Sequence, residues 1–308
     1  MDSHTSQALM TLGRWYVRHA PGAIGKASLV AEYLNPGLRD HPRRRIVRTR
    51  SGVRMGVDTQ DLIQRYLYLF GVWEPHMSRW LRGRLRPGDT FIDVGANIGY
   101  YSLLASRLVG AGGRVVAIEA SPVFHRRLVR QAGLNRSTNI RAVNEAVADS
   151  RKTVTFTLAS SRNMGANSIV PYAGPAESTF RVEARPLAEL LSAAEIGRAR
   201  VIKVDVEGAE GSVVRGLAPV LDRLRPDAEI TVEVTPERMA QLGDSAEELM
   251  STMRAHGFHA YRMANDYAPE SYPAALYGSA PEVPVRMRTT VVGESDLVFS
   301  RTDAETLP

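Results

Sequence analysis

The chain has 308 residues, a net charge of +6 and no cysteine, and 44% of its residues are hydrophobic. These values are typical of a globular protein with room for a large core, and the lack of cysteine excludes disulfides, thiolate metal sites and a cysteine nucleophile. No apolar run approaches the roughly 20 residues that cross a bilayer, and residues 1–20 lack the apolar segment of a secretory signal. We therefore expect a cytoplasmic protein without a membrane partner.

Arginine supplies nearly all of the positive charge, and one stretch within the first 55 residues is especially rich in it. This stretch contains Arg39, Arg43, Arg44, Arg45, Arg48, Arg50 and Arg54. Proteins that bind single-stranded nucleic acid combine such charges with aromatic side chains that stack on bases, and none is interleaved here. We expect no nucleic-acid partner. The stretch is interpreted as a solvated surface, with a docking patch for an anionic partner as the alternative.

The first 88 residues predict an N-terminal extension made of helices and a hairpin. Apolar residues at 46–47 and 53–57 flank Ser51-Gly52, which is the pattern of two strands joined by a tight turn. From residue 62 to residue 85 the apolar residues recur at helical spacing, and Pro87-Gly88 ends this section. We therefore place a boundary between an extension, residues 1–88, and a main domain, residues 89–308.

In the main domain short apolar segments alternate with amphipathic helical ones, which predicts an α/β fold with a doubly wound, mostly parallel sheet. The expected strands lie at 90–94, 114–118, 140–147, 201–205, 229–234, 258–263 and 297–300. Residues 151–186 interrupt this alternation. They predict two antiparallel strands, in which Val154, Phe156 and Phe180 alternate with polar residues, joined by a loop at 163–177.

A glycine-rich turn follows the first strand, with the sequence Asp93-Val94-Gly95-Ala96-Asn97-Ile98-Gly99. A dinucleotide site would show G-x-G-x-x-G, and an acid ahead of the first glycine would repel a pyrophosphate. Asp93 instead suits the ammonium group of a methionine tail, and the backbone N–H groups of the turn remain for the tail's carboxylate. Glu119, at the end of the next strand, suits the two hydroxyls of a ribose. The turn therefore predicts an S-adenosylmethionine site; the alternative is that Gly95 and Gly99 only permit a tight turn and close packing.

The expected cofactor is S-adenosyl-L-methionine, and a divalent metal is not expected because the seven histidines form no ligand cluster. If a divalent ion were present, its oxygen ligands would be Asp205, Glu207 and Glu233. The candidate cofactor-binding residues lie around the ends of the first three strands and are Asp93, Gly95, Ala96, Asn97, Gly99, Glu119, Ala120 and Glu145.

These features resemble the FkbM-type methyltransferases, which have the class I methyltransferase fold with a Rossmann-like, seven-stranded sheet. The resemblance covers residues 60–260 and rests on motifs at 73–75, 93–99, 119–122, 163–165 and, most specifically, 203–210. It implies methyl transfer from S-adenosylmethionine, commonly to a hydroxyl on a sugar, polyketide or other secondary metabolite. A peptide amide nitrogen is the alternative acceptor. An alternative from another class is a non-catalytic partner protein that binds S-adenosylmethionine.

Three residues of the 203–210 motif are the candidate catalytic residues. Methyl transfer to an alcohol gains from a general base near the acceptor oxygen, and Asp205 and Glu207 lie where open α/β sheets bind their ligands. Two adjacent acids also tend to raise the pKa of one of them, which suits a base. We predict Asp205 as base or acceptor ligand, Glu207 as part of the pocket and Lys203 as the residue that orients it. The alternative is structural: an ion pair of Lys203 with Glu210, and acids that cap the loop.

The acceptor is expected to be a small molecule. Base N-methylation usually uses an Asn/Asp-Pro-Pro-aromatic loop, where this chain has residues 205–208 instead, and C5-pyrimidine methylation needs a cysteine. Self-association is left open. Residues 1–55 and 264–294 lie outside the resemblance and are expected to shape the choice of acceptor. The candidate substrate-binding residues, each with a core or turn role as the alternative, are Glu74, Asn163, Gly165 and Asn167.

Overall fold

The computed structural model describes residues 3–159, 176–278 and 282–307. The chain divides into two compact units, of which the first contains residues 3–79, 265–278 and 282 and the second residues 80–159, 176–264 and 283–307. The division into an extension, residues 1–88, and a main domain, residues 89–308, remains a prediction from the sequence. Within the described ranges, none of the helices is long and apolar enough to cross a membrane.

The first unit is built from short helices and one hairpin. Its elements are α1 (Ser3–His19), α2 (Lys26–Ser28), the π-helix η1 (Leu29–Leu34), α3 (Asn35–Asp40), β1 (Arg44–Arg48), β2 (Arg54–Asp58), α4 (Leu62–Leu69), the start of α5 (Pro75–Arg84) and α13 (Ser271–Tyr277). The predicted hairpin is confirmed, because β1 and β2 pair as antiparallel strands from Arg44 opposite Asp58 to Arg48 opposite Arg54.

The helical section expected from residue 62 to residue 85 consists of two helices. Helix α4 ends before Gly71, whose φ of 74° is left-handed, and α5 begins at Pro75. The helical spacing of the apolar residues is confirmed for Tyr66 and Phe70, which are both buried. Their rings pack on Tyr272 of α13, with centroid distances of 4.8 and 4.7 Å, so a distant part of the chain completes this core.

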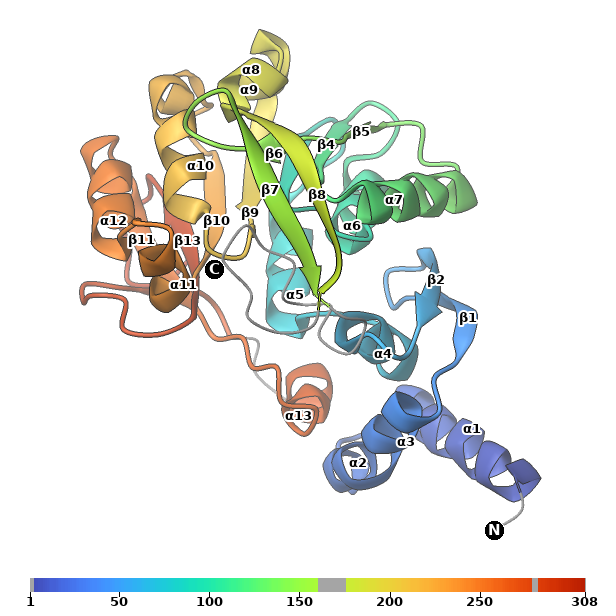
Figure 1. The fold of residues 1–308 in the computed structure, drawn as a ribbon. Helices are drawn as coiled ribbons and strands as arrows, with labels where there is room; N and C mark the ends of the chain where they lie inside the picture. The colour runs from blue at the N-terminus through green and yellow to red at the C-terminus, as the bar shows by residue number, and fades with distance from the viewer. Residues whose placement is uncertain (1–2, 160–175, 279–281, 308) are drawn as a thin grey trace. The chain divides into compact units, whose positions relative to one another are not determined.

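The second unit contains an eight-stranded sheet in the order β12-β11-β13-β10-β9-β3-β4-β5 (Figure 1). Strands β5, β4, β3, β9 and β10 run parallel, and β13 runs antiparallel to both of its neighbours. The predicted doubly wound, mostly parallel sheet is therefore confirmed. The eighth strand, beyond the seven expected, is the two-residue edge strand β12. The strands are β3 (Thr90–Val94), β4 (Arg114–Ile118), β5 (Ile140–Val143), β9 (Ala199–Val204), β10 (Glu229–Val234), β11 (His259–Met263), β12 (Val285–Arg286) and β13 (Ser295–Ser300).

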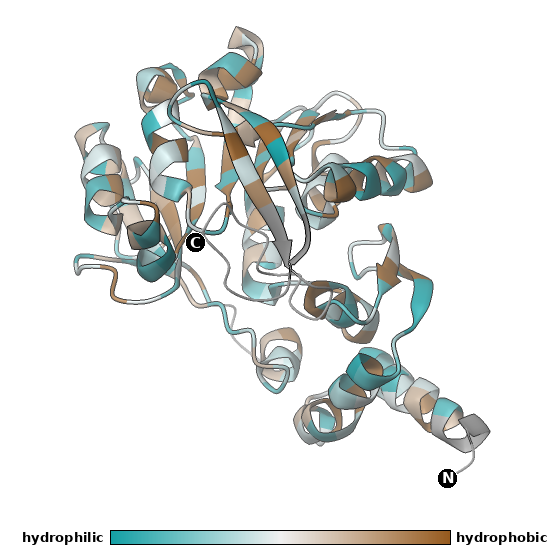
Figure 2. Cartoon of the chain, in the orientation of Figure 1, coloured by the Kyte–Doolittle hydropathy of each residue, from teal (hydrophilic) through white to brown (hydrophobic). Residues whose placement is uncertain are grey.

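Helices cover this sheet and supply the rest of its core. They are α6 (Tyr100–Val109), α7 (Pro122–Asn135), α8 (Leu187–Leu190), α9 (Ala193–Arg198), α10 (Glu210–Leu217), the 3-10 helix η3 (Ala218–Arg223), α11 (Pro236–Gln241) and α12 (Ala246–Ala255). The inner strands carry apolar runs, drawn in brown in Figure 2, as expected for a sheet buried on both faces. Ile202, Val204 and Ile230 are fully buried. Ser121 caps the start of α7, with Pro122 at its first position.

A second, smaller sheet lies in the same unit and consists of β6 (Ala146–Val147), β7 (Lys152–Ala159) and β8 (Ala176–Arg185). The predicted antiparallel pair is confirmed, since β7 and β8 pair from Lys152 opposite Ala184 to Ala159 opposite Ala176. The single strand expected at 140–147 is divided between the two sheets. Its first half, β5, pairs with β4, and its second half, β6, pairs with β8.

Candidate functional site

The glycine turn after β3 is held tightly against the end of β9. The N–H of Asp205 donates to the carbonyl of Val94 at 3.0 Å, which extends the pairing of the two strands. Gly95 has a φ of 84°, and a Cβ built on it would lie 1.7 Å from the carbonyl oxygen of Asp205. Glycine is therefore required here for two separate reasons, a left-handed conformation and a close backbone approach.

The backbone N–H groups of the turn are already used within the protein, contrary to the expectation that they remain for the carboxylate of a ligand. From Gly95 to Gly99 each one donates a hydrogen bond, and these bonds hold the turn in shape. The acceptors are the Ile118 carbonyl for both Gly95 and Ala96, Glu119 Oε2 for Asn97, the side chain of Asn97 for Ile98 and the Ala96 carbonyl for Gly99.

Gly99 has a turn-forming and packing role, which the sequence had allowed for both glycines, and Asn97 shares the unusual backbone conformation. Both have positive φ, 89° for Gly99 and 51° for Asn97. A Cβ on Gly99 would lie 3.1 Å from Leu128 of α7, so this glycine lets α6 start close to α7. Ala96, at 5% exposure, belongs to a small apolar cluster with Ala117 of β4 and Leu128. The turn thus forms a fixed surface at the end of β3.

Asp93 is the last but one residue of β3 and is 1% exposed. The hydroxyl of Ser102, in the first turn of α6, donates to its carboxylate at 2.5 Å. Burial raises the pKa of Asp93, while the nearby ammonium of Lys203 and the Ser102 hydrogen bond act in the opposite direction. This carboxyl group lies at the start of the glycine turn, and Lys203 and Ser102 only partly offset the effect of its burial.

Glu119 connects the two loops that follow β3 and β4. Its carboxylate oxygens accept hydrogen bonds from the backbone N–H groups of Asn97, at 2.7 Å, and Ser121, at 2.8 Å. Burial raises the pKa of Glu119 to about 7, in spite of these hydrogen bonds. A carboxyl group is therefore fixed at the end of β4, where the sequence predicted it.

Two further cofactor candidates lie near this position but have different contacts. Glu145 forms an ion pair with Arg185 of β8, in the smaller sheet. Ala120 follows Glu119, and the side-chain amide of Asn144 donates to the carbonyls of both residues, at 3.0 and 2.8 Å. Asn144, one residue before the predicted Glu145, is thus the side chain that contacts the end of β4.

Lys203 and Asp205, two of the candidate catalytic residues, meet at the end of β9. The ammonium of Lys203 donates to Asp205 Oδ2 at 2.7 Å and lies 5.0 Å from the ring centre of Tyr101. Burial would raise the pKa of Asp205, but Lys203, a hydrogen bond from Glu233 and the charge of Arg238 together hold it below its ordinary value. The raised pKa expected for one of the two adjacent acids is therefore not that of Asp205, because Lys203, the Glu233 hydrogen bond and Arg238 together outweigh its burial.

The loop after β9 is stabilised by its own acids. Glu210 is 1% exposed and accepts hydrogen bonds from the N–H groups of Val206, at 3.2 Å, and Gly208, at 3.0 Å. Burial raises the pKa of Glu210 to about 7. Glu207, with a φ of 58°, forms an ion pair with Arg238 of α11. Glu210, which the alternative interpretation paired with Lys203, instead caps the loop, and Lys203 bonds to Asp205.

The three acids named as ligands for a divalent ion do not form a metal site. Among the residues that the structure describes, no group of three or more histidine or acidic side chains is arranged to hold a metal. The reason is visible in their partners, since Glu233 shares a hydrogen bond with Asp205 while Glu207 is paired with Arg238.

Glu74 belongs to the first unit and lies in an aromatic environment. It is 5% exposed and has a φ of 42°. Its N–H donates to the hydroxyl of Tyr272 at 3.2 Å, and the hydroxyl of Tyr267 donates to its carboxylate at 3.4 Å. The other three substrate candidates, Asn163, Gly165 and Asn167, lie outside the described residues.

Four side chains of the site were not predicted, namely Tyr101, Ser102, Asn144 and Arg238. Ser102 had a usable signal, because it lies three residues after the last glycine of the turn, on the first turn of the following helix. Arg238 had none, since its ion pair with Glu207 joins two segments separated by a whole strand.

An antiparallel strand, β13, is inserted between β10 and β11, and a glycine turn flanked by acids follows β3. Together these two features define a methyltransferase domain of the class I fold that depends on S-adenosylmethionine. The family model of the Methyltransferase FkbM domain matches residues 93–260. This match covers more than half of the sequence, and the chain therefore belongs to the FkbM methyltransferase family.

Similar proteins include RNA methyltransferases as well as FkbM proteins. Ribosomal RNA large subunit methyltransferase E of Sorangium cellulosum is 36% identical over 64 residues, which are 21% of this chain and 30% of that protein. The crystal structure of an FkbM methyltransferase from Methylobacillus flagellatus KT has 13% identity and a TM-score of 0.43, covering 77% of this chain and 52% of that one. A putative rRNA methylase from Clostridium thermocellum has 10% identity and a TM-score of 0.41, covering 75% and 94%.

Proposed function

We propose that this protein transfers the methyl group of S-adenosylmethionine to a hydroxyl on a small molecule such as a sugar, a polyketide or another secondary metabolite. The observation that carries the proposal is the position of Asp205. Its backbone contacts the glycine turn at Gly95, and its carboxylate is fixed by Lys203. An ionised carboxylate is thus held beside the expected cofactor site, in a setting where a proton can be accepted.

The cofactor side of the proposal rests on two buried carboxyl groups at the ends of adjacent strands. Asp93 is the last but one residue of β3, and Glu119 directly follows β4. S-adenosylmethionine carries a positive sulfonium, a positive ammonium and two ribose hydroxyls, all of which are complementary to carboxylates. The ammonium is assigned to Asp93 and the ribose hydroxyls to Glu119. Because the N–H groups of the turn are bonded internally, the carboxylate of the cofactor needs a different donor.

On the acceptor side, Asp205 would accept the proton that the hydroxyl loses. Bound S-adenosylmethionine supplies an electrophilic methyl group and leaves as a neutral sulfide. The hydroxyl proton becomes more acidic as its oxygen forms the new bond, so a carboxylate of low pKa is a sufficient base late in that step. Lys203 would hold Asp205 in place, and Glu207 with Arg238 would form the wall of the pocket.

The same pKa argument favours a hydroxyl over the alternative acceptor, a peptide amide. An amide nitrogen must lose its proton early to become nucleophilic, which requires a stronger base than a carboxylate whose pKa is held below its ordinary value. The carboxylates at the strand ends also oppose the phosphate groups of RNA.

The test is the variant Asp205→Asn, which keeps the shape of the side chain but cannot accept a proton as a carboxylate does. We expect S-adenosylmethionine binding, measured by calorimetry, to remain, and methyl transfer from labelled cofactor to hydroxyl acceptors to fall about 10²–10⁴-fold. Asp222→Asn, at an exposed position on η3, is the matched control. Unchanged turnover in Asp205→Asn would rule out the base, and cofactor binding without turnover by the unmodified protein would favour the non-catalytic partner.

A further inference from the structure

The N-terminal segment from α1 to β2, residues 3–58, has an unusual concentration of exposed apolar side chains. Among the side chains that the structure describes, ten large apolar ones are exposed, and six of these belong to this segment. They are Leu9, Leu12, Trp15, Ile24, Tyr33 and Ile46, with exposures of 52%, 64%, 57%, 88%, 65% and 60%. Exposed apolar groups at this density are typical of an interaction surface.

Helix α1 carries three of them on one side. Leu9, Leu12 and Trp15 follow one another at intervals of three residues, so they lie along one face of the helix. The side of the helix opposite Trp15 packs inward, where Val17 is 1% exposed and Gly13 lies against Leu34 of η1. The helix is thus fixed to its own unit by one face and presents leucine and tryptophan on another.

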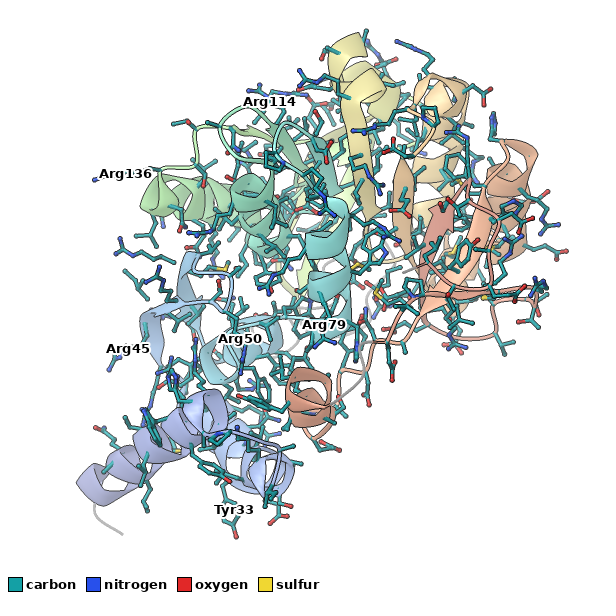
Figure 3. The ribbon with its side chains drawn as sticks, turned by 180° about the vertical axis from the view of Figure 1, so that it is seen from behind. Tyr33, Arg45, Arg50, Arg79, Arg114 and Arg136 are labelled. Atoms are coloured by element: carbon teal, nitrogen blue, oxygen red, sulfur yellow. The ribbon has the colours of Figure 1, made fainter. Side chains whose placement is uncertain are left out.

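The loop after α1 extends this apolar surface. The hydroxyl of Tyr16 donates to the carbonyl of Ile24 at 2.7 Å, which holds the most exposed of the six residues beside the helix. Tyr33 of η1 projects away from its ribbon, as Figure 3 shows. These residues are held in place by the fold, so their exposure does not result from an unfolded tail.

The same segment holds the positive charge of the chain. Residues 3–58 contain ten arginine and lysine residues but only three acids, a net charge of +7, while the whole chain has +6. Helix α1 contains no acid, and Arg44 of β1 keeps 87% of its side chain exposed even though it pairs with Asp58. Arg45 points away from the same strand (Figure 3).

From this combination we propose that residues 3–58 bind the surface of a membrane that contains anionic phospholipids. Leu9, Leu12 and Trp15 would insert at the boundary between headgroups and acyl chains. The exposed arginines would pair with lipid phosphates; they are Arg39, Arg44, Arg45, Arg48, Arg50 and Arg54. A second copy of the chain fits this surface less well because two segments of +7 repel each other. Nucleic acid offers phosphates but gives exposed leucines no apolar environment. That no helix within the described ranges is able to span a membrane does not bear on binding at the surface.

The experiment uses the full chain and vesicles of phosphatidylcholine with or without phosphatidylglycerol. We expect the protein to float with the phosphatidylglycerol vesicles only, and added salt to weaken this binding. Leu12→Glu should lower the affinity at least about tenfold, since it removes a large inserted side chain and adds a repelled charge. Val129→Glu, at an exposed apolar position on α7, is the matched control and should bind as the unmodified protein does.

Tryptophan fluorescence gives an independent readout. The chain has three tryptophans, and Trp73 and Trp80 are buried while Trp15 is exposed. A blue shift on adding anionic vesicles therefore reports Trp15, and Trp15→Phe should remove the shift while the protein still floats.

Three results would overturn the proposal. The first is equal behaviour with both kinds of vesicle, and the second is an equal loss of binding in Leu12→Glu and Val129→Glu. The third is a dimer, seen by sedimentation without vesicles, that Leu12→Glu dissociates. Cofactor binding by each variant, together with its circular dichroism spectrum, shows that the variant is folded.

Discussion

Gly95 is the residue at which a single added methyl group has the largest expected effect. In Gly95→Ala the new Cβ meets the Asp205 carbonyl at 1.7 Å, so either the turn or the end of β9 must move. We expect this variant to lose S-adenosylmethionine binding in calorimetry. We also expect a lower free energy of unfolding, by more than the roughly 1–2 kcal/mol that a left-handed alanine costs.

Gly88→Ala is the matched control, because Gly88 has a φ of 91° and nothing within 4 Å of its added Cβ. Its free energy of unfolding should fall only by what the left-handed conformation costs an alanine, and it should bind the cofactor normally. Equal losses of stability in the two variants would show that the contact with the Asp205 carbonyl adds nothing to the loss in Gly95→Ala.

Glu119 gives the protein a pH dependence near neutrality. Burial raises its pKa from 4.5 to about 7, so between these values the folded protein binds a proton that the unfolded chain has lost. The free energy of unfolding of the free protein should therefore fall as the pH rises through this window. Glu210, also raised to about 7, adds a second contribution of the same sign. Denaturation of Glu119→Gln across the window should show a smaller slope than the unmodified protein.

The same titration predicts the opposite trend for cofactor binding. Hydroxyl groups that donate to Glu119 favour its ionised form, so affinity for S-adenosylmethionine should rise with pH up to about 7 and then level off. Calorimetry below, at and above this pH measures the trend. Glu119→Gln should bind S-adenosylmethionine more weakly and without this pH dependence. If the affinity of Glu119→Gln still rose with pH as before, another group would be responsible for the pH dependence.

At the scale of elements, the loop between β9 and α10 depends on Glu210. In Glu210→Ala the N–H groups of Val206 and Gly208 lose their acceptor, at a cost of about 1–3 kcal/mol for each donor that stays buried and unsatisfied. We expect the free energy of unfolding to fall and methyl transfer to fall further than cofactor binding, because this loop carries Glu207.

Glu210→Gln is the conservative control, since its amide oxygen can still accept hydrogen bonds. It should recover most of the stability and turnover that Glu210→Ala loses, as measured by denaturation and by transfer from labelled cofactor. Similar defects in both variants would mean that charge, not the hydrogen bonds of Val206 and Gly208, supports the loop.

The elements that could be predicted are those whose pattern is local. The strands from β3 to β10 carry continuous apolar runs, and Lys203 and Asp205 meet because alternate residues of an extended segment share a side. The division of residues 140–147 between two sheets depends on β8, which lies about 40 residues further along the chain. The use of the N–H groups of the turn depends on the Ile118 carbonyl, which no spacing within residues 93–99 indicates.

At the scale of the whole molecule, the net positive charge is carried by residues 3–58 and not by the proposed site. We therefore expect salt to have only a weak effect on catalysis. Residues 3–58 carry +7, whereas the proposed site lies among carboxyl groups in the second unit. With a neutral small acceptor, kcat/KM should change less than about threefold from about 50 to 200 mM salt, whereas an RNA acceptor would lose about 10³-fold or more. Initial rates at several salt concentrations distinguish the two, and a steep loss would contradict a neutral acceptor.

The place of β13 in the sheet has a consequence for biosynthesis. This strand is the last of the sheet in chain order, yet it lies between β10 and β11 and pairs with both. While the ribosome is still making residues 264–294, β10 and β11 have no partner between them and offer open edges to other chains. The nascent protein therefore passes through a stage at which chaperones are most needed, and a stop codon before Ser295 should yield an aggregating product.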